Sequence, residues 1–286
     1  MEQKHQDQGQ KRGIDLHVHT YVSDGYLSPS EAVERAYDSG VDTIAITDHD
    51  TVSGLEEAMQ RGKEIGVDVI PGVEISARNG SSVHILGYFP GKTPADLSGV
   101  EDYLEKTQNG RTQRTYHQIE LLNQDGYDIS REEVDSCRKG VYTPKNAIVD
   151  VLVNKGHVKD DKEGLALLES SRYDVPYSPE WVVTPEEAVE MITSYGGKAV
   201  LAHPGKLMKR YDINDFVGKL ADAGLKGIEV YSPKNSVGQR EQLAEIANNY
   251  GLFMTYGTDF HRRNHDMGSV AGSEVDAECI IEGVRG

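Results

Sequence analysis

Cysteine is scarce in this chain, whose 286 residues contain only Cys137 and Cys279. The two lie far apart in the sequence and neither belongs to a CxxC pair, which argues against a disulfide framework and against a thiolate metal site. A reducing cytoplasm is the usual location of such a protein. No apolar run approaches the length that a membrane span needs. We therefore expect a cytoplasmic protein that does not engage a membrane.

Positively charged residues are also few: the chain has 30 Lys and Arg residues against 47 Asp and Glu residues, which gives a formal net charge of -17. Strong binding of nucleic acid along a broad surface comes from clustered Lys and Arg. A large nucleic-acid surface is therefore not expected. Phosphorylated small molecules are not excluded, since bound divalent cations supply strong positive charge locally.

Short runs rich in β-branched residues alternate with amphipathic helical patterns, which indicates an α/β fold with parallel strands and crossover helices. Seven strands are predicted, at residues 13–19, 43–47, 67–74, 83–89, 198–203, 227–231 and 252–259. The helices around them are predicted at residues 28–39, 54–65, 184–195, 213–223 and 239–250.

The alternation stops between Pro90 and Val183, where helical and charged patterns take over. We interpret residues 91–183 as a helical subdomain inserted into the α/β domain, with helices at residues 96–122, 144–155 and 161–168. The α/β domain itself is expected to comprise residues 13–90 and 184–270. Residues 1–12 are interpreted as a disordered leader and residues 271–286 as a C-terminal tail.

Side chains that can bind a metal follow most of the predicted strands. His17 and His19 lie two apart in an extended strand, so both imidazoles face the same way. The further candidates at or near strand ends are Asp24, His49, Glu74, His84, His203, Asp259 and His261. The carboxyl ends of parallel barrel strands meet at one face, so we expect a single cluster there. Imidazole mixed with carboxylate suits Mn, Fe or Zn, and adjacent ions of this kind suit phosphoryl chemistry.

The motifs HxHT with SDG, ITDHD, PGVEIS, HILGYF, AHP and GTDFH, taken in this order, resemble the PHP (polymerase and histidinol phosphatase) family. The resemblance implies a distorted seven-stranded (β/α)7 barrel with a trinuclear metal centre. It implies a first ion held by His17, His19, Glu74 and Asp259. It implies that Glu74 bridges to a second ion on His84 and His203, and that Asp24, His49 and His261 hold a third.

The Asp24 of SDG and the helical insertion make the chain similar to the branch of the family that acts on nucleotides and short oligonucleotides. Within that branch it resembles nucleoside 3′,5′-bisphosphate phosphatases and 5′-3′ oligoribonucleases. The resemblance implies a metal-dependent phosphoesterase with two to three divalent ions (Mn, Fe or Zn). The residues expected to act in the hydrolysis itself are Asp24, His49, Glu74, His203 and His261. The alternatives are a metal-binding PHP module without turnover and a phosphomonoesterase of the histidinol phosphate type.

Substrate contacts are expected from the insertion. Relatives tend to carry a basic-Pro-His segment where this chain reads Thr143-Pro144-Lys145, so Lys145 is the candidate for a phosphate contact. Arg111 and Arg114 lie three apart on one predicted helix face, where they either bind a substrate phosphate or form a solvated charged surface. Lys206 lies near the metal face and is a weaker candidate.

Three acidic residues near the expected ligands are ambiguous. Asp48 and Asp50 flank His49, and they either orient its imidazole or cap a helix in contact with solvent. Glu229 ends the sixth predicted strand, where we favour a structural hydrogen bond over a role in supporting the ligands.

Overall fold

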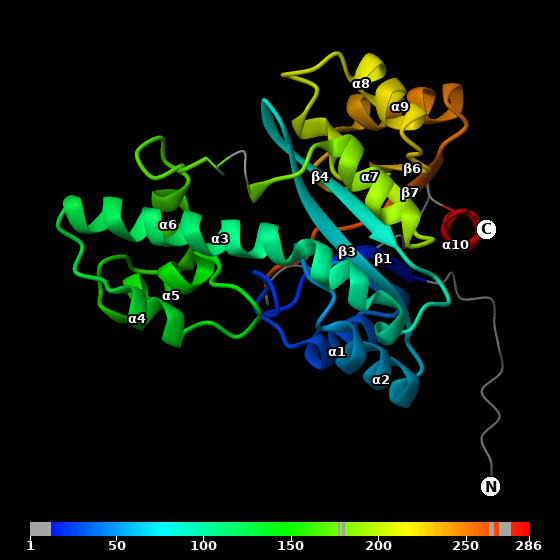
Figure 1. Ribbon diagram of the computed structural model, residues 1–286. Helices are drawn as coiled ribbons and strands as arrows, with labels where there is room; N and C mark the ends of the chain where they lie inside the picture. Colours follow the sequence, from blue (N-terminus) through cyan, green and yellow to red (C-terminus); the bar gives the residue numbers. More distant parts are fainter. Residues whose placement is uncertain (1–12, 177, 179–180, 263–265, 269–275) are drawn as a thin grey trace, which may run out of the picture.

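A seven-stranded sheet, ordered β1 to β7 as in the chain, forms the centre of the molecule (Figure 1). The computed structural model describes residues 13–176, 178, 181–262, 266–268 and 276–286, so the expected leader at 1–12 lies outside them. The strands are β1 (Gly13–Val18), β2 (Val41–Ile46), β3 (Asp68–Asn79), β4 (Ser81–Tyr88), β5 (Lys198–Leu201), β6 (Gly227–Tyr231) and β7 (Phe253–Tyr256).

The sheet closes into a barrel where β1 meets the segment that follows β7. Val18 pairs with Phe260, and the backbone amide of His19 donates to the carbonyl of Phe260 at 2.9 Å. The amide of Phe260 in turn donates to the carbonyl of His17 at 3.1 Å. The predicted seven-stranded α/β barrel is thereby confirmed, and its closure brings the residues after β7 beside those at the end of β1.

The direction of β4 distorts this barrel. β4 pairs antiparallel with both β3 and β5, whereas the other neighbouring strands pair in parallel. The prediction of parallel strands throughout was therefore wrong here. Asn79-Gly80 forms a tight hairpin with Gly80 at a φ of +69°, a conformation that glycine adopts at little cost. No crossover helix separates β3 from β4, so the chain reverses directly.

Five helices cover the outside of the barrel: α1 (Pro29–Asp38), α2 (Leu55–Ile65), α7 (Pro185–Ser194), α8 (Ile213–Asp222) and α9 (Val237–Asn249). The predicted starts of α1 and α7 are confirmed, since Ser28 and Thr184 each form a capping box with a proline in the first turn. Apolar side chains of these helices pack on the outer face of the sheet. A second cluster, with Ile14, Leu86 and Val200 at its centre, fills the barrel interior.

The insertion contains α3 (Ser98–Gln124), α4 (Arg131–Ser136), α5 (Lys145–Asn154) and α6 (Asp161–Leu168). It has a hydrophobic cluster of its own, which includes Ile119, Leu122 and Ile148. The start of α3 belongs to the barrel instead, because Val100 and Leu104 pack in the outer barrel cluster. One long helix therefore spans both parts, as Figure 1 shows. We call the part formed by the end of α3, by α4 to α6 and by the segment that follows α6 as far as Val175 the cap.

The C-terminal segment contains a helix that the sequence pattern did not predict. α10 (Ala277–Arg285) starts after Asp276, whose side chain accepts from the amides of Glu278 and Cys279. Its buried residues Ile280 and Val284 join the cluster inside the barrel. The helix therefore closes one end of the barrel core.

We expect Ile280→Ala to lower the free energy of unfolding by about 2–5 kcal/mol, because it deletes buried methyl and methylene groups and leaves a cavity. Glu282→Ala on the exposed side of the same helix is the control and should change stability by less than about 0.5 kcal/mol. Denaturant unfolding measures both. Equal stabilities of the two variants would show that α10 does not complete the core.

Candidate metal centre

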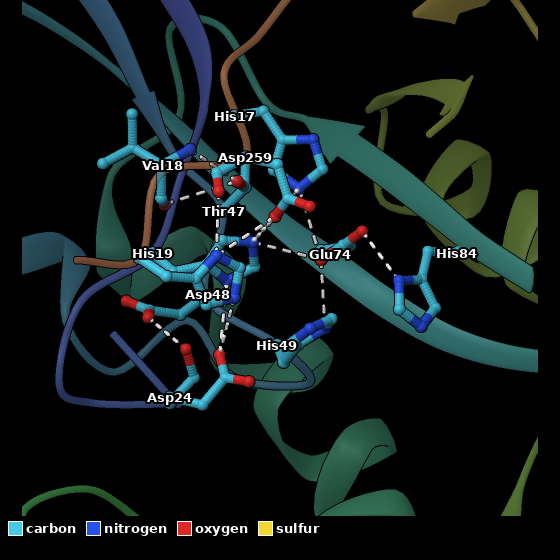
Figure 2. Close-up of polar contacts among 12 residues, drawn as sticks. His17, Val18, His19, Asp24, Thr47, Asp48, His49, Glu74, His84 and Asp259 are labelled. Carbon is cyan, nitrogen blue, oxygen red and sulfur yellow. Dashed lines mark hydrogen bonds and ion pairs between the residues drawn. The ribbon is translucent and has the colours of Figure 1, made fainter. Parts of the chain in front are cut away.

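All nine expected ligands lie at one end of the barrel, grouped around the carboxylate of Glu74. Figure 2 labels those other than His203 and His261. His17 is on β1 and His19 directly follows it, while Glu74 and His84 lie on the paired strands β3 and β4. The others come from the loops that follow strands: Asp24, His49, His203, Asp259 and His261. The expectation that these side chains gather at one face is thus met, and the reversed β4 brings His84 in from the opposite direction.

A first group surrounds the Oε2 atom of Glu74. The Nε2 atoms of His17 and His19 lie 3.3 Å and 3.2 Å from it, and the Oδ1 atom of Asp259 lies 3.4 Å and 3.2 Å from the same two nitrogens. Two ligands bound to one ion at about 2.0–2.2 Å lie roughly 3.0–3.5 Å apart in tetrahedral or octahedral geometry. The spacing of these four atoms fits one shared ion.

The second oxygen of Glu74 faces the other side of the cluster. Its Oε1 atom lies 3.0 Å from Nδ1 of His84 and 3.1 Å from Nε2 of His203. Nδ1 of His49 lies 3.1 Å from Oε2. The converging atoms within reach of one ion here belong to His49, Glu74 and His84. His203 contacts Glu74 without joining that compact group.

The third group contains Asp24, His49 and His261, as expected, together with His19. Nε2 of His261 lies 3.2 Å from Oδ1 of Asp24, and Nδ1 of His19 lies 3.8 Å from the same oxygen. His19 therefore stands between two groups, with Nε2 facing the first and Nδ1 facing the third. Each group offers imidazole and carboxylate together, the donor set that suits Mn, Fe or Zn.

The hydrogen-bonding state of these atoms tests whether they fit a metal. Buried polar groups in proteins nearly always find a partner. Among the described residues, eleven buried side-chain atoms lack a hydrogen bond, and six of them belong to five of the expected ligands. These five residues are His17, His19, Asp24, His49 and Glu74. Divalent cations bound between them would satisfy these six atoms, so the residues fit the metals that the sequence implies.

Electrostatics point the same way. Burial lowers the pKa of His203 to about 3 and that of His261 to about 4, which keeps both imidazoles neutral and able to bind a metal at neutral pH. Burial alone would also lower the pKa of His17, but the carboxylates of Glu74 and Glu229 offset it and raise the value to about 9. A positive charge is therefore favoured beside Glu74, whether a proton or a metal ion supplies it.

The backbone is strained at the same place. Among the described residues, only three other than glycine have a positive φ: Asp50 at 53°, His203 at 30° and Asp259 at 55°. Such conformations cost of order 1–3 kcal/mol each and persist where the surroundings impose them. Two of the three are expected ligands and the third directly follows His49, so the strain lies at the proposed metal centre.

Buried carboxylates behind the ligands hold them in place. Glu229 accepts from Nδ1 of His17 at 2.8 Å and from the backbone amide of His203 at 2.6 Å. Both hydrogen bonds orient expected ligands, which is the role that the sequence analysis did not favour. Such outer partners fix the tautomer and direction of a metal-binding histidine.

Asp48 and Asp15 stabilise the loops rather than single ligands. Asp48 does not orient His49 and instead accepts from Thr20 and Ser23, which shapes the loop that carries Asp24. Asp15, which sequence reasoning missed, accepts from the amide of Thr258 at 2.9 Å and so fixes the residue before Asp259. Its place two residues before His17 in the predicted strand is the only sequence signal for it.

Two cavities open on this cluster, of about 860 Å³ and about 390 Å³, and both are lined by Asp24, His49, His84 and Lys145. The larger one also holds Lys206, Lys234 and Arg262, together with apolar surface from Tyr26, Leu165 and Pro233. The smaller one is lined by the basic side chains Arg78, Arg111, Arg114, Lys145 and Arg210. Lys234, which contacts Asp259, follows β6 and was missed although it obeys the same strand-end rule.

The three expected substrate contacts reach these cavities in different ways. Lys145 is the first residue of α5, after Pro144 as predicted, and its Nζ lies 3.1 Å from Oε1 of Glu169. Arg114 donates to the carbonyl of Val175 in the cap. Arg111 points its Nε at Asp50 and is mostly buried. Of these three side chains, only Lys145 lines both cavities.

A closed α/β barrel with buried histidines and carboxylates at its strand ends defines a metal-dependent hydrolase. The PHP domain family matches residues 15–170, and the chain belongs to this family. It is a phosphoesterase that depends on divalent metal. No described helix is both long enough and apolar enough to cross a membrane.

Three curated relatives align along most of the chain. The phosphoribosyl 1,2-cyclic phosphate 1,2-diphosphodiesterase of Eggerthella lenta is 31% identical, over 86% of this chain and 93% of its own length. The 5′-3′ exoribonuclease of Haemophilus influenzae is 32% identical, over 86% and 89%. The 3′,5′-nucleoside bisphosphate phosphatase of Chromobacterium violaceum is 32% identical, over 87% of each chain.

A solved structure shares the whole arrangement. It belongs to a protein of Bifidobacterium adolescentis that is assigned as a metal-dependent phosphoesterase. The two superpose with a TM-score of 0.83 at 29% sequence identity, over 95% of both chains. The likeness therefore includes the cap as well as the barrel.

We expect Glu74→Gln to reduce both metal content and turnover, because it removes the charge that two ions would share. Mutation of a residue that only supports a metal ligand typically lowers metal affinity or activity by about 10–100-fold. Mutation of a proposed ligand should therefore lower turnover by more than about tenfold. Elemental analysis after reconstitution with Mn²⁺ should find more than one ion per chain in the wild type and fewer in the variant. Exposed Glu56→Gln is the control. Less than one ion per wild-type chain would contradict the cluster.

Proposed function

We propose that this protein hydrolyses phosphate esters of nucleotides or short oligonucleotides, with nucleoside 3′,5′-bisphosphate to 5′-monophosphate as the leading example. The observation that carries the proposal is the cavity of about 390 Å³ beside the metal cluster, lined by four arginines and Lys145. The lining of this cavity is basic although the chain as a whole has a net charge of -17, so the positive charge is concentrated locally. It suits a second phosphate on a substrate whose first phosphate is at the metals.

The names of the relatives support the same substrate class. One acts on nucleoside bisphosphates, one on RNA from its 5′ end and one on a phosphoribosyl cyclic phosphate. Each of these substrates carries phosphate on ribose. The larger cavity adds apolar surface from Tyr26 and Leu165, which can face the nucleoside while the basic groups face phosphate.

We further propose two to three divalent ions, Mn, Fe or Zn, held by the nine residues as the family pattern implies. Such ions polarise a phosphoryl oxygen and lower the pKa of bound water. The chain's own groups then complete the site. His203 and His261 offer neutral imidazoles, and Glu229 keeps the ring of His17 turned toward Glu74.

Two lysines beside the cluster fit the charge of the reacting phosphate. Lys234 contacts Asp259, and Nζ of Lys206 lies 4.0 Å from Oδ2 of the same residue. Both line the larger cavity. Ammonium groups in this position bind phosphoryl oxygens and stabilise the negative charge that grows as the ester bond breaks.

The substrate class can be tested against the histidinol phosphate alternative. We expect protein reconstituted with Mn²⁺ to hydrolyse nucleoside 3′,5′-bisphosphates or short oligonucleotides faster than histidinol phosphate, because only the former place a second phosphate in the basic cavity. The measurement is kcat/KM for each compound under the same conditions. Faster turnover of histidinol phosphate would reject this class, and no turnover of any ester at full metal loading would favour a module without catalysis.

Lys145→Ala should raise KM for the best nucleotide substrate much more than it lowers kcat. The lysine opens α5, where free backbone amides and the helix dipole already favour an anion, and its contact is the same in the ground and transition states. The loss in kcat/KM should be worth about 1–3 kcal/mol. Lys155→Ala, at the other end of α5 and also paired with a glutamate, is the matched control. Identical kinetics of both variants would place Lys145 outside the substrate site.

A further inference from the structure

Three side chains on one face of α3 contact the short loop that follows His49. Oε2 of Glu101 accepts from the amide of Val52 at 2.7 Å, and Nε2 of Gln108 donates to the carbonyl of Asp50 at 2.9 Å. Nε of Arg111 donates to Oδ2 of Asp50. The spacing of seven and three residues keeps all three on the same side of the helix. A helix shared by the barrel and the cap thus holds a loop of the metal centre.

That loop is joined directly to two of the proposed ligands. His49 forms a β-bridge with Glu74, the amide of Glu74 donates to the carbonyl of Asp48 at 3.1 Å, and the amide of Asp50 donates to the carbonyl of Glu74 at 2.9 Å. Oδ1 of Asp50 accepts from the amide of Ser76, two residues further on, at 2.7 Å. Whatever fixes Asp50 therefore also fixes the positions of His49 and Glu74.

Asp50 needs such support. Its φ of 53° is a conformation that an aspartate holds only when its surroundings impose it, and its carboxylate is fully buried. A buried carboxylate requires a partner of opposite charge, which Arg111 provides. The same guanidinium reaches Oγ of Ser76 with Nη2, so it connects the loop after His49 to the strand that carries Glu74.

The surroundings of Arg111 differ from those of a substrate contact. Its side chain is only 11% exposed, two of its nitrogens face Asp50 and Ser76, and its guanidinium carbon lies 5.3 Å from the centre of the Tyr142 ring. Arg114, three residues along the helix, makes its contacts with Val175 and Asp174 of the cap instead. The two arginines that the sequence pairs together therefore face different parts of the molecule.

We propose that Arg111 is a positioning residue for the metal centre. Acting through Asp50, it sets the separation and direction of His49 and Glu74, so that the metal affinity of the barrel depends on a helix of the insertion. The proposal rests on the proposed metal binding by His49 and Glu74. It assigns Arg111 to the centre itself and leaves the substrate phosphate to the other basic side chains of the cavity.

The test compares Arg111→Met with Arg114→Met, which removes the neighbouring guanidinium that contacts Val175 and Asp174. Apo-protein is titrated with Mn²⁺, and kcat and KM are measured at limiting and at excess Mn²⁺. We expect Arg111→Met to weaken Mn²⁺ binding by about 10–100-fold, as the loss of an outer partner typically does. Its kcat should recover at excess Mn²⁺ while KM for the nucleotide stays unchanged. Arg114→Met should bind Mn²⁺ as the wild type does.

Wild-type Mn²⁺ affinity of Arg111→Met combined with a raised KM would overturn the proposal and make Arg111 a substrate contact. The metal titration does not depend on which ester is hydrolysed, so this outcome is separate from a failure of the proposed substrate class. If Arg111→Met does not fold, Arg111→Lys serves instead. It keeps the charge but cannot reach Asp50 and Ser76 together, so a smaller loss of Mn²⁺ affinity is expected. Unchanged affinity of Arg111→Lys with a raised KM would again reject the proposal.

Discussion

The carboxylate of Glu74 is the group on which the rest of the site depends. It is fully buried, which is costly for a charge, and the histidines around it lower its pKa far enough that it stays ionised despite burial. Its two oxygens face two different sets of side chains, with His17 and His19 on one side and His84 and His203 on the other. A buried anion requires positive charge close by, and the proposed metal ions would supply it.

The barrel supplies the rigidity that such a site needs. Besides Glu74 and Asp259, the described residues include five buried carboxylates in β1, in β6 and in the loops around them: Asp15, Asp24, Asp48, Asp50 and Glu229. All but Asp24 hold a backbone amide or a ligand by hydrogen bonds, and they offset the cost of the left-handed backbone at Asp50, His203 and Asp259. These buried carboxylates therefore keep the loops and side chains of the expected ligands in position.

The sequence predicted those parts of the molecule that depend on local pattern. The seven strands and the convergence of residues such as His17 and His203 follow from strand periodicity and from the strand-end rule. The direction of β4 was missed because a prediction of parallel strands gave no weight to Asn79-Gly80 as a hairpin turn. Asp15 and Arg111 were missed or assigned differently because their partners lie 243 and 61 residues away, and spacing along a chain carries no information about contacts at that range.

The side chains proposed to bind metal differ in charge from those proposed to bind the substrate phosphate. The acidic and imidazole groups come from the barrel, whereas the basic groups come from both parts. Arg78 and Arg210 belong to the barrel and Lys145 belongs to the cap. A lysine at the start of α5 acts as a point charge on a flexible stem and does not impose the planar two-point geometry of an arginine. Phosphates held in different orientations can therefore satisfy it. With Lys145 as the proposed substrate contact, the cap would set which phosphate ester is accepted while the cluster around Glu74 would keep the same reaction.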